Sequence, residues 1–314
     1  MLTVLIATHN GVRTLPDVLE AYCRLDPPVG GWKLVIVDNN STDKTRDVIH
    51  SFADRLPLSY LFEPAQGQNV ARNRALSALD GDLVVLSDDD AVPRADWLVQ
   101  MRSAADAHPG FGIFGGVVLP RWEVPPEPWL LQWVPLQPCF AVTDPAWEEG
   151  PIKSDFVFGP NMAIRGKVFE TGYRFDETIG PRRGSYAMGA ETELTRRLNE
   201  AGMLAWHVRR AVVEHVIRSS QMTPEWVLAR AIRYGRGQYR WRSRDRARLV
   251  GLLASTPSLV RGILSLSTRI AFAKWRGDEQ ELFRRRWDRN CLIGRAAETF
   301  TQSLQKFRHR TRDR

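Results

Sequence analysis

The sequence predicts an α/β domain with a mainly parallel, Rossmann-like sheet flanked by helices, followed by a basic helical appendage. In the first two thirds of the chain, short apolar and β-branched segments alternate with segments of helical apolar spacing. This alternation is typical of parallel sheets whose strands are joined by helices. The last third of the chain has helical spacing and a large excess of Lys and Arg. These two observations define the predicted fold class.

The alternation gives a specific set of elements along the chain. Each expected strand is a short apolar run that ends in turn-forming residues, and each expected helix has apolar residues three or four positions apart. The expected strands are Leu2–Ala7, Lys33–Val37, Leu58–Phe62 and Leu83–Leu86, and the expected helices are Leu15–Leu25, Thr45–Leu56, Asn69–Leu79, Trp97–Ala107 and Glu191–Glu200. Apolar structure also resumes at Phe156–Arg165, and a short strand-like run surrounds His215.

Residues 120–151 break this pattern. They are rich in proline, contain four tryptophans and show little periodicity. We expect a long irregular excursion there, and long loops in compact domains are often functional.

Charge is distributed unevenly. Residues 1–220 contain 22 Lys/Arg and 28 Asp/Glu, a balance of −6, whereas residues 221–314 contain 22 and 8, a balance of +14. We therefore expect a domain over 1–220 and a basic helical region over 221–314. Such a region can contact anionic lipid, an anionic polymer or nucleic acid. It lacks a recognisable nucleic-acid-binding motif, so no nucleic acid is expected.

Within the basic region, Leu249–Ala273 is largely apolar but is interrupted by Pro257, Arg261 and Arg269. This stretch predicts a helical hairpin rather than a membrane-spanning helix. The hairpin is expected either to pack on the body of the protein or to lie in a membrane interface.

The cysteines and the N-terminal residues indicate the compartment. Cys23, Cys139 and Cys291 are far apart, so they form neither a disulfide framework nor a CxxC metal site. The first residues lack a basic segment followed by a long apolar one, so a signal peptide is not expected. We expect a cytoplasmic protein, with peripheral contact at the inner face of an anionic membrane through residues 221–314 as a further hypothesis.

Polar clusters follow three of the predicted strands. They are Thr8-His9-Asn10, Asp38-Asn39-Asn40 and Asp88-Asp89-Asp90. In open parallel sheets, ligands bind beyond the carboxyl ends of the strands. The coincidence of three clusters at such ends predicts a binding site.

The chemistry of the aspartate cluster favours a divalent cation. Three adjacent carboxylates repel one another, and a cation relieves that repulsion. Mg²⁺ and Mn²⁺ prefer oxygen ligands, which come partly from protein and partly from phosphate. The alternative interpretation is a solvated acidic turn or an acidic helix N-terminus. Asp38 can accept hydrogen bonds from a base or a ribose, or it can cap the helix that follows.

Five motifs, in order, resemble the signature of the family 2 glycosyltransferases, which are inverting enzymes of the GT-A fold that contain a DxD motif and serve bacterial polysaccharide and glycolipid biosynthesis. The resemblance covers roughly residues 2–220. The motifs are Val35–Asp43, Gly67–Asn73, Gly81-Asp82 with Asp88–Asp90 and Trp97-Leu98, Gly159–Arg165, and Gly189–Leu194.

The resemblance implies a GT-A domain over 1–220, with a nucleotide-sugar half at about 1–115 and an acceptor half at about 116–220. It implies that Asp38 binds the nucleobase. The other residues expected at the nucleotide-sugar are Thr8, Asn10, Arg72, Asp88 and Asp89. Asp88 and Asp90 are the ends of the DxD motif, and Asp90, Asp88 and the late histidine His215 are the expected ligands of Mn²⁺ or Mg²⁺.

The family usually has Glu-Asp where this chain has Ala190-Glu191. The second acid of that pair is the usual general base, so the resemblance assigns this role to Glu191. Glu193 is the competing candidate. A single base with no obvious second nucleophile near it indicates inversion in a single displacement. Asn161, Glu193 and Trp122 are the candidates for the acceptor side.

The expected function is transfer of a sugar from a nucleotide-diphosphate-sugar, a UDP-sugar in our hypothesis, to a hydroxyl of a saccharide or lipid-linked acceptor. One alternative is a catalytically degenerate GT-A-like binding protein, which Ala190 favours and the retained aspartates oppose. Another is a sugar-nucleotide nucleotidyltransferase, but the first strand is not followed by a glycine-rich phosphate loop with a lysine. A dinucleotide-dependent oxidoreductase would need GxGxxG, which Thr8–Gly11 does not supply.

Overall fold

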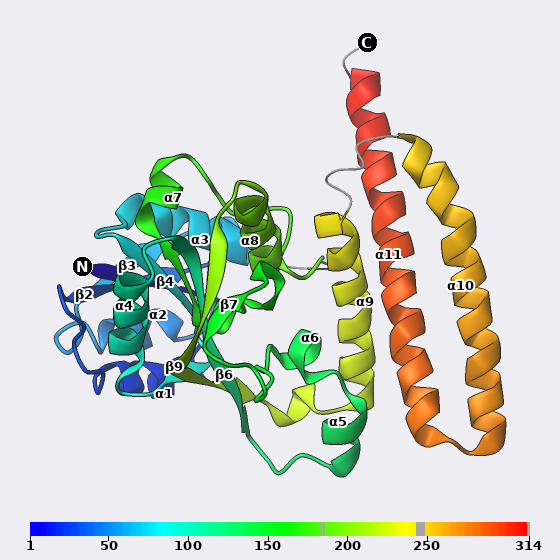
Figure 1. Ribbon diagram of the computed structural model, residues 1–314, viewed down its shortest axis with the longest axis horizontal. Coiled ribbons are helices and arrows are strands. Elements are labelled where there is room, and N and C mark those ends of the chain that lie inside the picture. Colours follow the sequence, from blue (N-terminus) through cyan, green and yellow to red (C-terminus); the bar gives the residue numbers. More distant parts are fainter. Residues whose placement is uncertain (183, 185, 243–248, 313–314) are drawn as a thin grey trace. The chain divides into compact units, whose positions relative to one another are not determined.

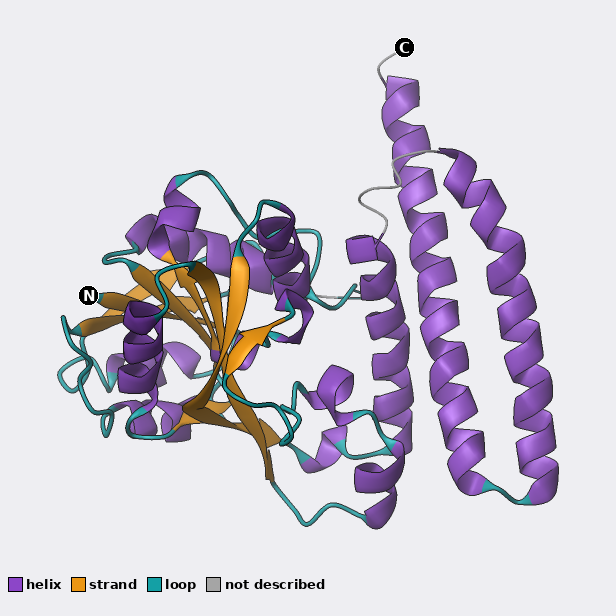
Figure 2. Cartoon of the chain, in the orientation of Figure 1, coloured by secondary structure: helices purple, strands orange, loops and turns teal. Residues whose placement is uncertain are grey.

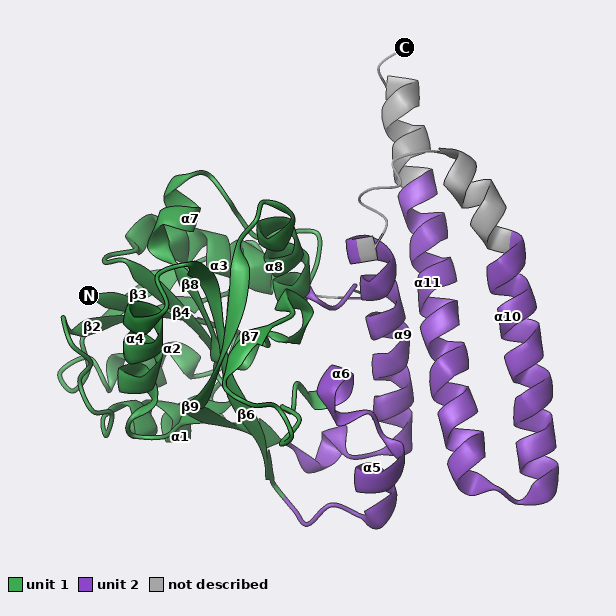
Figure 3. Ribbon diagram, in the orientation of Figure 1, with its two compact units in different colours: residues 1–123, 140–183, 190–217 green, residues 124–139, 184–189, 218–314 purple. Residues whose placement is uncertain are grey.

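The computed structural model describes residues 1–182, 184, 186–242 and 249–312. The chain divides into two compact units, coloured separately in Figure 3. Unit 1 comprises Met1–Glu123, Phe140–Arg183 and Ala190–Ile217, and unit 2 comprises Val124–Cys139, Gly184–Gly189 and Arg218–Arg314.

Unit 1 is built on one mixed sheet, shown in orange in Figure 2. Within the described residues the sheet has nine strands in the order β3-β2-β1-β4-β8-β6-β9-β5, and β7 pairs with β9. The strands are β1 (Leu2–Thr8), β2 (Trp32–Asp38), β3 (Leu58–Phe62), β4 (Leu83–Asp88), β5 (Ala91–Pro93), β6 (Phe111–Trp122), β7 (Gly150–Ile152), β8 (Met162–Arg165) and β9 (Leu204–Ile217).

The block β3-β2-β1-β4 is parallel throughout, as predicted. The remaining strands are mixed: β8 runs antiparallel to β4 and β6, β6 and β9 are parallel, and β5 and β7 run antiparallel to β9. The α/β class is therefore confirmed. Of the mixed half, the apolar structure expected at Phe156–Arg165 contains β8, and the strand-like run expected around His215 is part of β9. β6 was missed because it contains three glycines and a proline, which weaken the strand pattern.

Helices cover both faces of the sheet, so alternate strand residues enter two different cores. Val4 and Ile6 pack in a cluster with α1 (Leu15–Tyr22) and α4 (Trp97–Ala107). Leu5 packs in the other cluster, with α3 (Gln68–Ala75) and α8 (Ala190–Glu200). Strands buried on both faces read as continuous apolar runs, which is why β1, β2 and β4 were readily predicted. The edge strand β3 is only partly buried. The shorter helices of this unit are α2 (Thr45–His50) and α7 (Gly166–Glu170), with 3₁₀ turns at Leu76–Ala78, Ser154–Phe156 and Gly159–Asn161.

Several expected elements differ from the structure. The hairpin predicted from Leu249–Ala273 is instead one continuous helix, α10 (Leu249–Arg276), with Pro257 inside it. The helix predicted over Thr45–Leu56 ends at His50, where the Ser51 hydroxyl donates to the Val48 carbonyl at 2.7 Å and competes with continued helical bonding. The excursion predicted at 120–151 is not wholly irregular, because β6 extends to Trp122 and is followed by α5 (Pro128–Trp133), α6 (Leu136–Phe140) and β7.

Unit 2 is helical, as predicted for the C-terminal region. Its long helices are α9 (Pro224–Arg242), α10 (Leu249–Arg276) and α11 (Glu279–Arg312), preceded by a 3₁₀ turn at Ser219–Gln221. They lie side by side with α11 between the other two (Figure 1). In the part of the chain that the structure describes, none of the helices combines the length and the apolar character needed to cross a bilayer.

Candidate functional site

The structure brings the predicted polar clusters to one edge of the sheet. Thr8, Asp38 and Asp88 end the adjacent strands β1, β2 and β4. In the strand register Thr8 lies opposite Asp38, and Ala7 lies opposite Asp88. The parallel register thus places the three side chains at the carboxyl edge, where α/β sheets bind ligands.

Thr8 joins this edge to the middle of the aspartate cluster. Its hydroxyl donates to Asp89 Oδ2 at 2.5 Å. Gly11 makes room for this contact, because a Cβ there would lie 2.4 Å from Thr8 Oγ1 and 2.9 Å from Asp89 Oδ2. Asp89 is therefore bound by Thr8, the last residue of β1.

Asp38 is buried, and both of its carboxylate oxygens accept hydrogen bonds from other groups of the protein. Oδ1 accepts from the Ser41 backbone N–H at 2.9 Å, and Oδ2 accepts from the Tyr60 hydroxyl at 3.1 Å. Asn10 braces the same turn: it adopts a φ of 54° and accepts a hydrogen bond from the Thr42 N–H at 2.8 Å. The sequence did not indicate a role for Tyr60. Tyr60 lies on the neighbouring strand β3, two positions before Phe62, the residue opposite Asp38.

Arg72 is the central cation of the site. Its side chain is 1% exposed, and it donates to Glu191 Oε1 at 2.7 Å and to Asp88 Oδ1 at 3.2 Å. Its guanidinium also lies 5.5 Å from the centre of the Phe175 ring. Burial lowers the pKa of Arg72, but the carboxylates of Glu191 and Asp88 raise it by more. The net shift of the Arg72 pKa is upward, so Arg72 remains charged. The structure thus shows Arg72 linking the aspartate cluster to α8.

Asp88 lies among several charges. Burial raises its pKa, the Arg72 guanidinium lowers it, and Asp90 and Glu191 raise it, with a net result of about 6. Gln68 Nε2 also donates to Asp88 Oδ1, at 3.2 Å. Gln68 is a second residue that motif reading missed, although it lies within the Gly67–Asn73 motif. A cation at Asp88 would favour its ionised form.

Asp90 and His215 face each other. His215 Nε2 lies 3.4 Å from Asp90 Oδ1, and the other ring nitrogen, Nδ1, donates to the Phe140 carbonyl at 2.8 Å. This orientation follows from pairing of Ala91 with His215 between β5 and β9. Burial lowers the pKa of His215, whereas Asp90 and Asp88 raise it, and the net shift is upward.

The donor set at this point fits a divalent cation. Two neighbouring ligands of an octahedral ion with bonds of 2.0–2.1 Å lie about 3 Å apart, close to the 3.4 Å between Asp90 Oδ1 and His215 Nε2. Across the described residues, no group of three His, Cys, Asp or Glu side chains forms a metal shell by itself. A cation here would need further oxygen ligands, as expected when a diphosphate supplies them.

Glu191 and Glu193 lie on different faces of α8. Two positions along a helix correspond to a rotation of about 200°. The Glu191 side chain is 19% exposed and contacts Arg72, whereas Glu193 is 3% exposed and forms a two-bond ion pair with Arg197 at 2.8 and 2.9 Å. The arrangement brings Glu191, rather than Glu193, to the aspartate cluster.

Gly159 sets the position of Glu191. A Cβ on Gly159 would lie 2.3 Å from Glu191 Oε1 and 2.7 Å from its Cδ. The Gly159–Arg165 motif was identified in the sequence, but its close approach to Glu191 was not. The glycine itself was the available signal, because a side chain can approach the backbone this closely only where the residue has no Cβ.

The other acceptor-side candidates differ in exposure. Asn161 is fully buried: its Oδ1 accepts from Trp97 Nε1 at 2.8 Å, and its Nδ2 donates to the Val117 and Ala211 carbonyls. Its amide therefore holds elements of the fold together. Trp122 is partly exposed and packs on Phe140, whose carbonyl accepts the His215 hydrogen bond.

Two solved structures with a similar fold are named as complexes with nucleotide-sugars. The mannosyltransferase PcManGT from Pyrobaculum calidifontis in complex with GDP-Man and Mn²⁺ has a TM-score of 0.63 and 19% identity, over 95% of this chain and 86% of that one. TarS 1–349 from S. aureus in complex with UDP-GlcNAc has a TM-score of 0.55 and 14% identity, over 96% and 92%. These likenesses confirm the predicted GT-A fold.

Curated relatives match over part of their length. A validoxylamine A glucosyltransferase from Streptomyces hygroscopicus subsp. jinggangensis is 32% identical over 111 residues, which are 35% of this chain and 26% of that protein. A PGL/p-HBAD biosynthesis glycosyltransferase from Mycobacterium bovis is 31% identical over 123 residues, 38% of this chain and 47% of that protein. The matched segments thus span about a quarter to a half of these relatives.

The family model for glycosyl transferase family 2 matches residues 3–172, which is more than half of the chain. That segment contains the edge of strand ends, the aspartate cluster and Arg72. The chain therefore belongs to glycosyl transferase family 2.

Proposed function

We propose that this protein is an inverting glycosyltransferase that moves a sugar from a nucleotide-diphosphate-sugar to an acceptor hydroxyl. One observation carries the proposal. Buried Arg72 joins Asp88 at the end of β4 to Glu191 at the start of α8. Glu191 lies 119 residues after Arg72 in the chain. A donor-binding carboxylate and a proton-accepting carboxylate are thereby held in one cluster.

The nucleotide-sugar would bind at the carboxyl edge of β1, β2 and β4. Asp38 would accept from the base, with Thr8 and Asn10 supporting the turn around it, and the ribose would lie toward Asp88 and Asp89. We propose a UDP-sugar as the donor. Family membership and the nucleotide-sugars named with the similar structures support this choice of ligand class.

Asp90, Asp88 and His215 would hold Mn²⁺ or Mg²⁺. When bound, the cation neutralises charge on the diphosphate leaving group. His215 is oriented for this role, because its Nδ1 is committed to the Phe140 carbonyl and its Nε2 faces Asp90. The Mn²⁺ named with PcManGT supports a divalent ion.

Glu191 would act as the general base. Its carboxylate is held between Arg72 and the glycine at position 159, so it is positioned before the acceptor arrives. It would take the proton from the acceptor hydroxyl as that oxygen attacks the anomeric carbon. One carboxylate acting on the acceptor implies a single displacement with inversion. Partly exposed Trp122 is the remaining candidate for stacking on an acceptor sugar.

The acceptor would be a saccharide or a lipid-linked saccharide in bacterial polysaccharide or glycolipid assembly, in the cytoplasm. The relative from Mycobacterium bovis, named for PGL/p-HBAD biosynthesis, supports this setting. The first alternative is a degenerate binding protein, which the Ala190 departure favours. The second is a nucleotidyltransferase, which would release pyrophosphate rather than a nucleoside diphosphate.

A donor screen tests the proposal. Purified protein is incubated with a panel of nucleotide-sugars and Mn²⁺, and release of nucleoside diphosphate is measured with saccharide and lipid-linked acceptors. We expect metal-dependent release with one donor class. Metal-dependent donor binding without release would favour the degenerate protein, pyrophosphate release would favour the nucleotidyltransferase, and the absence of both binding and release would refute all catalytic readings.

A further inference from the structure

Helix α10 carries a second apolar face that no described residue covers. Val260, Leu264, Phe272 and Trp275 are 50%, 61%, 55% and 80% exposed. At about 100° per residue they lie within about 120° of one another around the helix, on one face, a largely apolar stripe that also contains exposed Arg261 and Thr268. Exposed Ala271 lies within the same stripe.

The opposite face of α10 packs within unit 2. Ala273 is 3% exposed, and a Cβ on Gly262 would lie 3.0 Å from Leu292 of α11. In Figure 1, α11 lies between α9 and α10, so α10 contacts the bundle along one side. The exposed stripe is therefore distinct from the face of α10 that packs against α11. Packing within unit 2 does not explain the stripe.

The charges of α10 all have one sign. The helix contains Arg261, Arg269, Lys274 and Arg276 and has no Asp or Glu. Lys274 lies on one border of the apolar stripe and Arg269 and Arg276 lie on the other, whereas Arg261 lies within it. The stripe ends in two aromatic side chains. Such a combination is typical of helices that lie in the plane of a membrane interface, with apolar side chains in the acyl boundary and cations at the phosphates.

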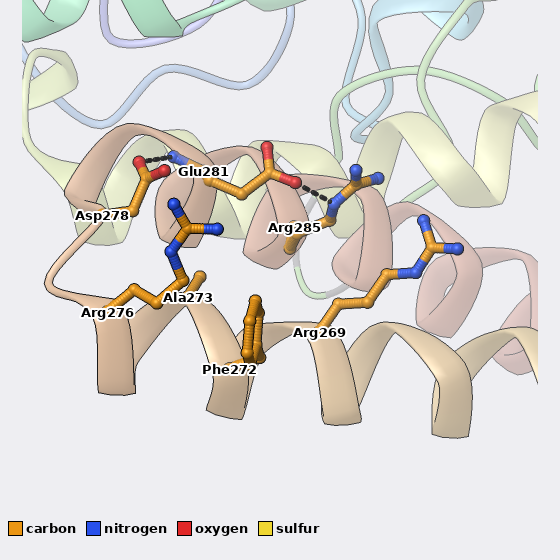
Figure 4. Close-up of a pocket in the computed structure, with 7 residues that line it drawn as sticks. All are labelled: Arg269, Phe272, Ala273, Arg276, Asp278, Glu281 and Arg285. Atoms are coloured by element: carbon orange, nitrogen blue, oxygen red, sulfur yellow. Dashed lines mark hydrogen bonds and ion pairs between the residues drawn. The ribbon is translucent and has the colours of Figure 1, made fainter.

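A basic pocket adjoins the aromatic end of the stripe. It has a volume of about 340 Å³ and lies between the end of α10 and the start of α11. Its lining residues include three arginines, Arg269, Arg276 and Arg285, and two acids, Asp278 and Glu281. Figure 4 shows the Arg269 and Arg276 side chains rising from α10 on either side of Phe272.

The acids of this pocket already have partners. Arg285 donates to Glu281 at 2.7 Å, and Asp278 accepts from the Glu281 backbone N–H at 3.0 Å. Arg276 lies 5.6 Å from the centre of the Phe272 ring. Among the interactions of the described residues, neither Arg269 nor Arg276 forms an ion pair with a carboxylate. Both remain available to an external anion such as a lipid phosphate.

We propose that the exposed face of α10, with Arg269 and Arg276 at its border, docks the protein on an anionic phospholipid bilayer. Phe272 and Trp275 enter the acyl boundary, and the two arginines bind headgroup phosphates. A second copy of the chain fits less well, because it would place the cations of one α10 against those of another. This surface lies in unit 2, so its function is testable independently of sugar transfer.

The test is flotation of the full-length protein with vesicles of phosphatidylcholine, with and without phosphatidylglycerol. We expect binding to the anionic vesicles to exceed binding to the neutral ones at least tenfold. The double variants Phe272→Ser/Trp275→Ser and Arg269→Glu/Arg276→Glu should each weaken anionic binding by about tenfold or more. Circular dichroism and thermal melting would show that these surface variants remain folded.

A matched control separates local contact from net charge. Lys153 and Lys167 are exposed residues of unit 1, and Lys153→Glu/Lys167→Glu changes the net charge by the same amount as the arginine pair. We expect this control to retain most of the binding. Equal losses in both charge variants, equal binding to neutral and anionic vesicles, or no binding by the unaltered protein would each overturn the proposal. So would a dimer that the aromatic variant abolishes in the absence of vesicle binding.

Discussion

Replacing Gly159 by alanine is a minimal perturbation of the proposed base. The added methyl group would lie 2.3, 2.7 and 2.9 Å from Oε1, Cδ and Cγ of Glu191. Carbon and oxygen atoms do not approach so closely without a bond, so the Glu191 carboxylate must move by about 1 Å. Gly159 does not have a positive φ, so alanine itself fits the backbone.

The movement should separate Glu191 from Arg72, which now lies 2.7 Å away. A displacement of this size in a reacting group costs about 10²-fold in rate, within the roughly 10²–10⁴-fold that a general base contributes. We expect Gly159→Ala to lower kcat by about 10²-fold. Donor binding should change little, because Asp38, Asp88 and Asp90 lie on other elements.

The assay is steady-state release of nucleoside diphosphate, with donor affinity measured separately by calorimetry. Gly110→Ala is a matched control, because a Cβ at Gly110 meets no atom within 4 Å and its φ is not positive. The control should keep normal kcat. A Gly159→Ala enzyme with normal kcat would refute the reasoning, since Glu191 would then tolerate displacement from its present position.

Three further outcomes follow from buried groups. Arg72→Met should lower the free energy of unfolding by about 3 kcal/mol, because it leaves two carboxylates without their buried cation, and urea titration measures this loss. Trp97→Phe should cost about 2 kcal/mol in the same titration, because it removes the 2.8 Å bond to the Asn161 amide oxygen. Burial raises the pKa of Cys139 and of Cys291 to about 12, so we expect Ellman's reagent at mildly alkaline pH to modify only Cys23 in the native protein. It should modify all three thiols in guanidinium, and rapid native reaction of more than one thiol would contradict the burial.

The sequence predicted the elements whose pattern is local. Leu58–Phe62 and Trp97–Ala107 have the bounds expected for a strand and a helix, because each has a clear apolar period and distinct ends. β6 was missed since its stability comes from pairing with β8 and β9, which are far away in the chain. Long-range pairing of this kind leaves no local apolar period.

The site was predictable to a similar extent. Asp38 and Asp88 could be placed together because the ends of adjacent parallel strands must meet at one edge. The bridging position of Arg72 could not be predicted, because its partner Glu191 belongs to a helix that approaches only in the folded chain. For Asn161, the motif led us to expect a position near the acceptor. Its amide is instead hydrogen-bonded to two backbone carbonyls and to the buried indole of Trp97.

The role of Glu191 is the central claim, and a pair of isosteric variants tests it most directly. Glu191→Gln and Glu193→Gln are compared for nucleoside diphosphate release and for donor affinity in the presence of Mn²⁺. We expect Glu191→Gln to lose at least about 10²-fold in kcat while it keeps donor affinity, and Glu193→Gln to retain turnover. Normal turnover by Glu191→Gln would contradict the account.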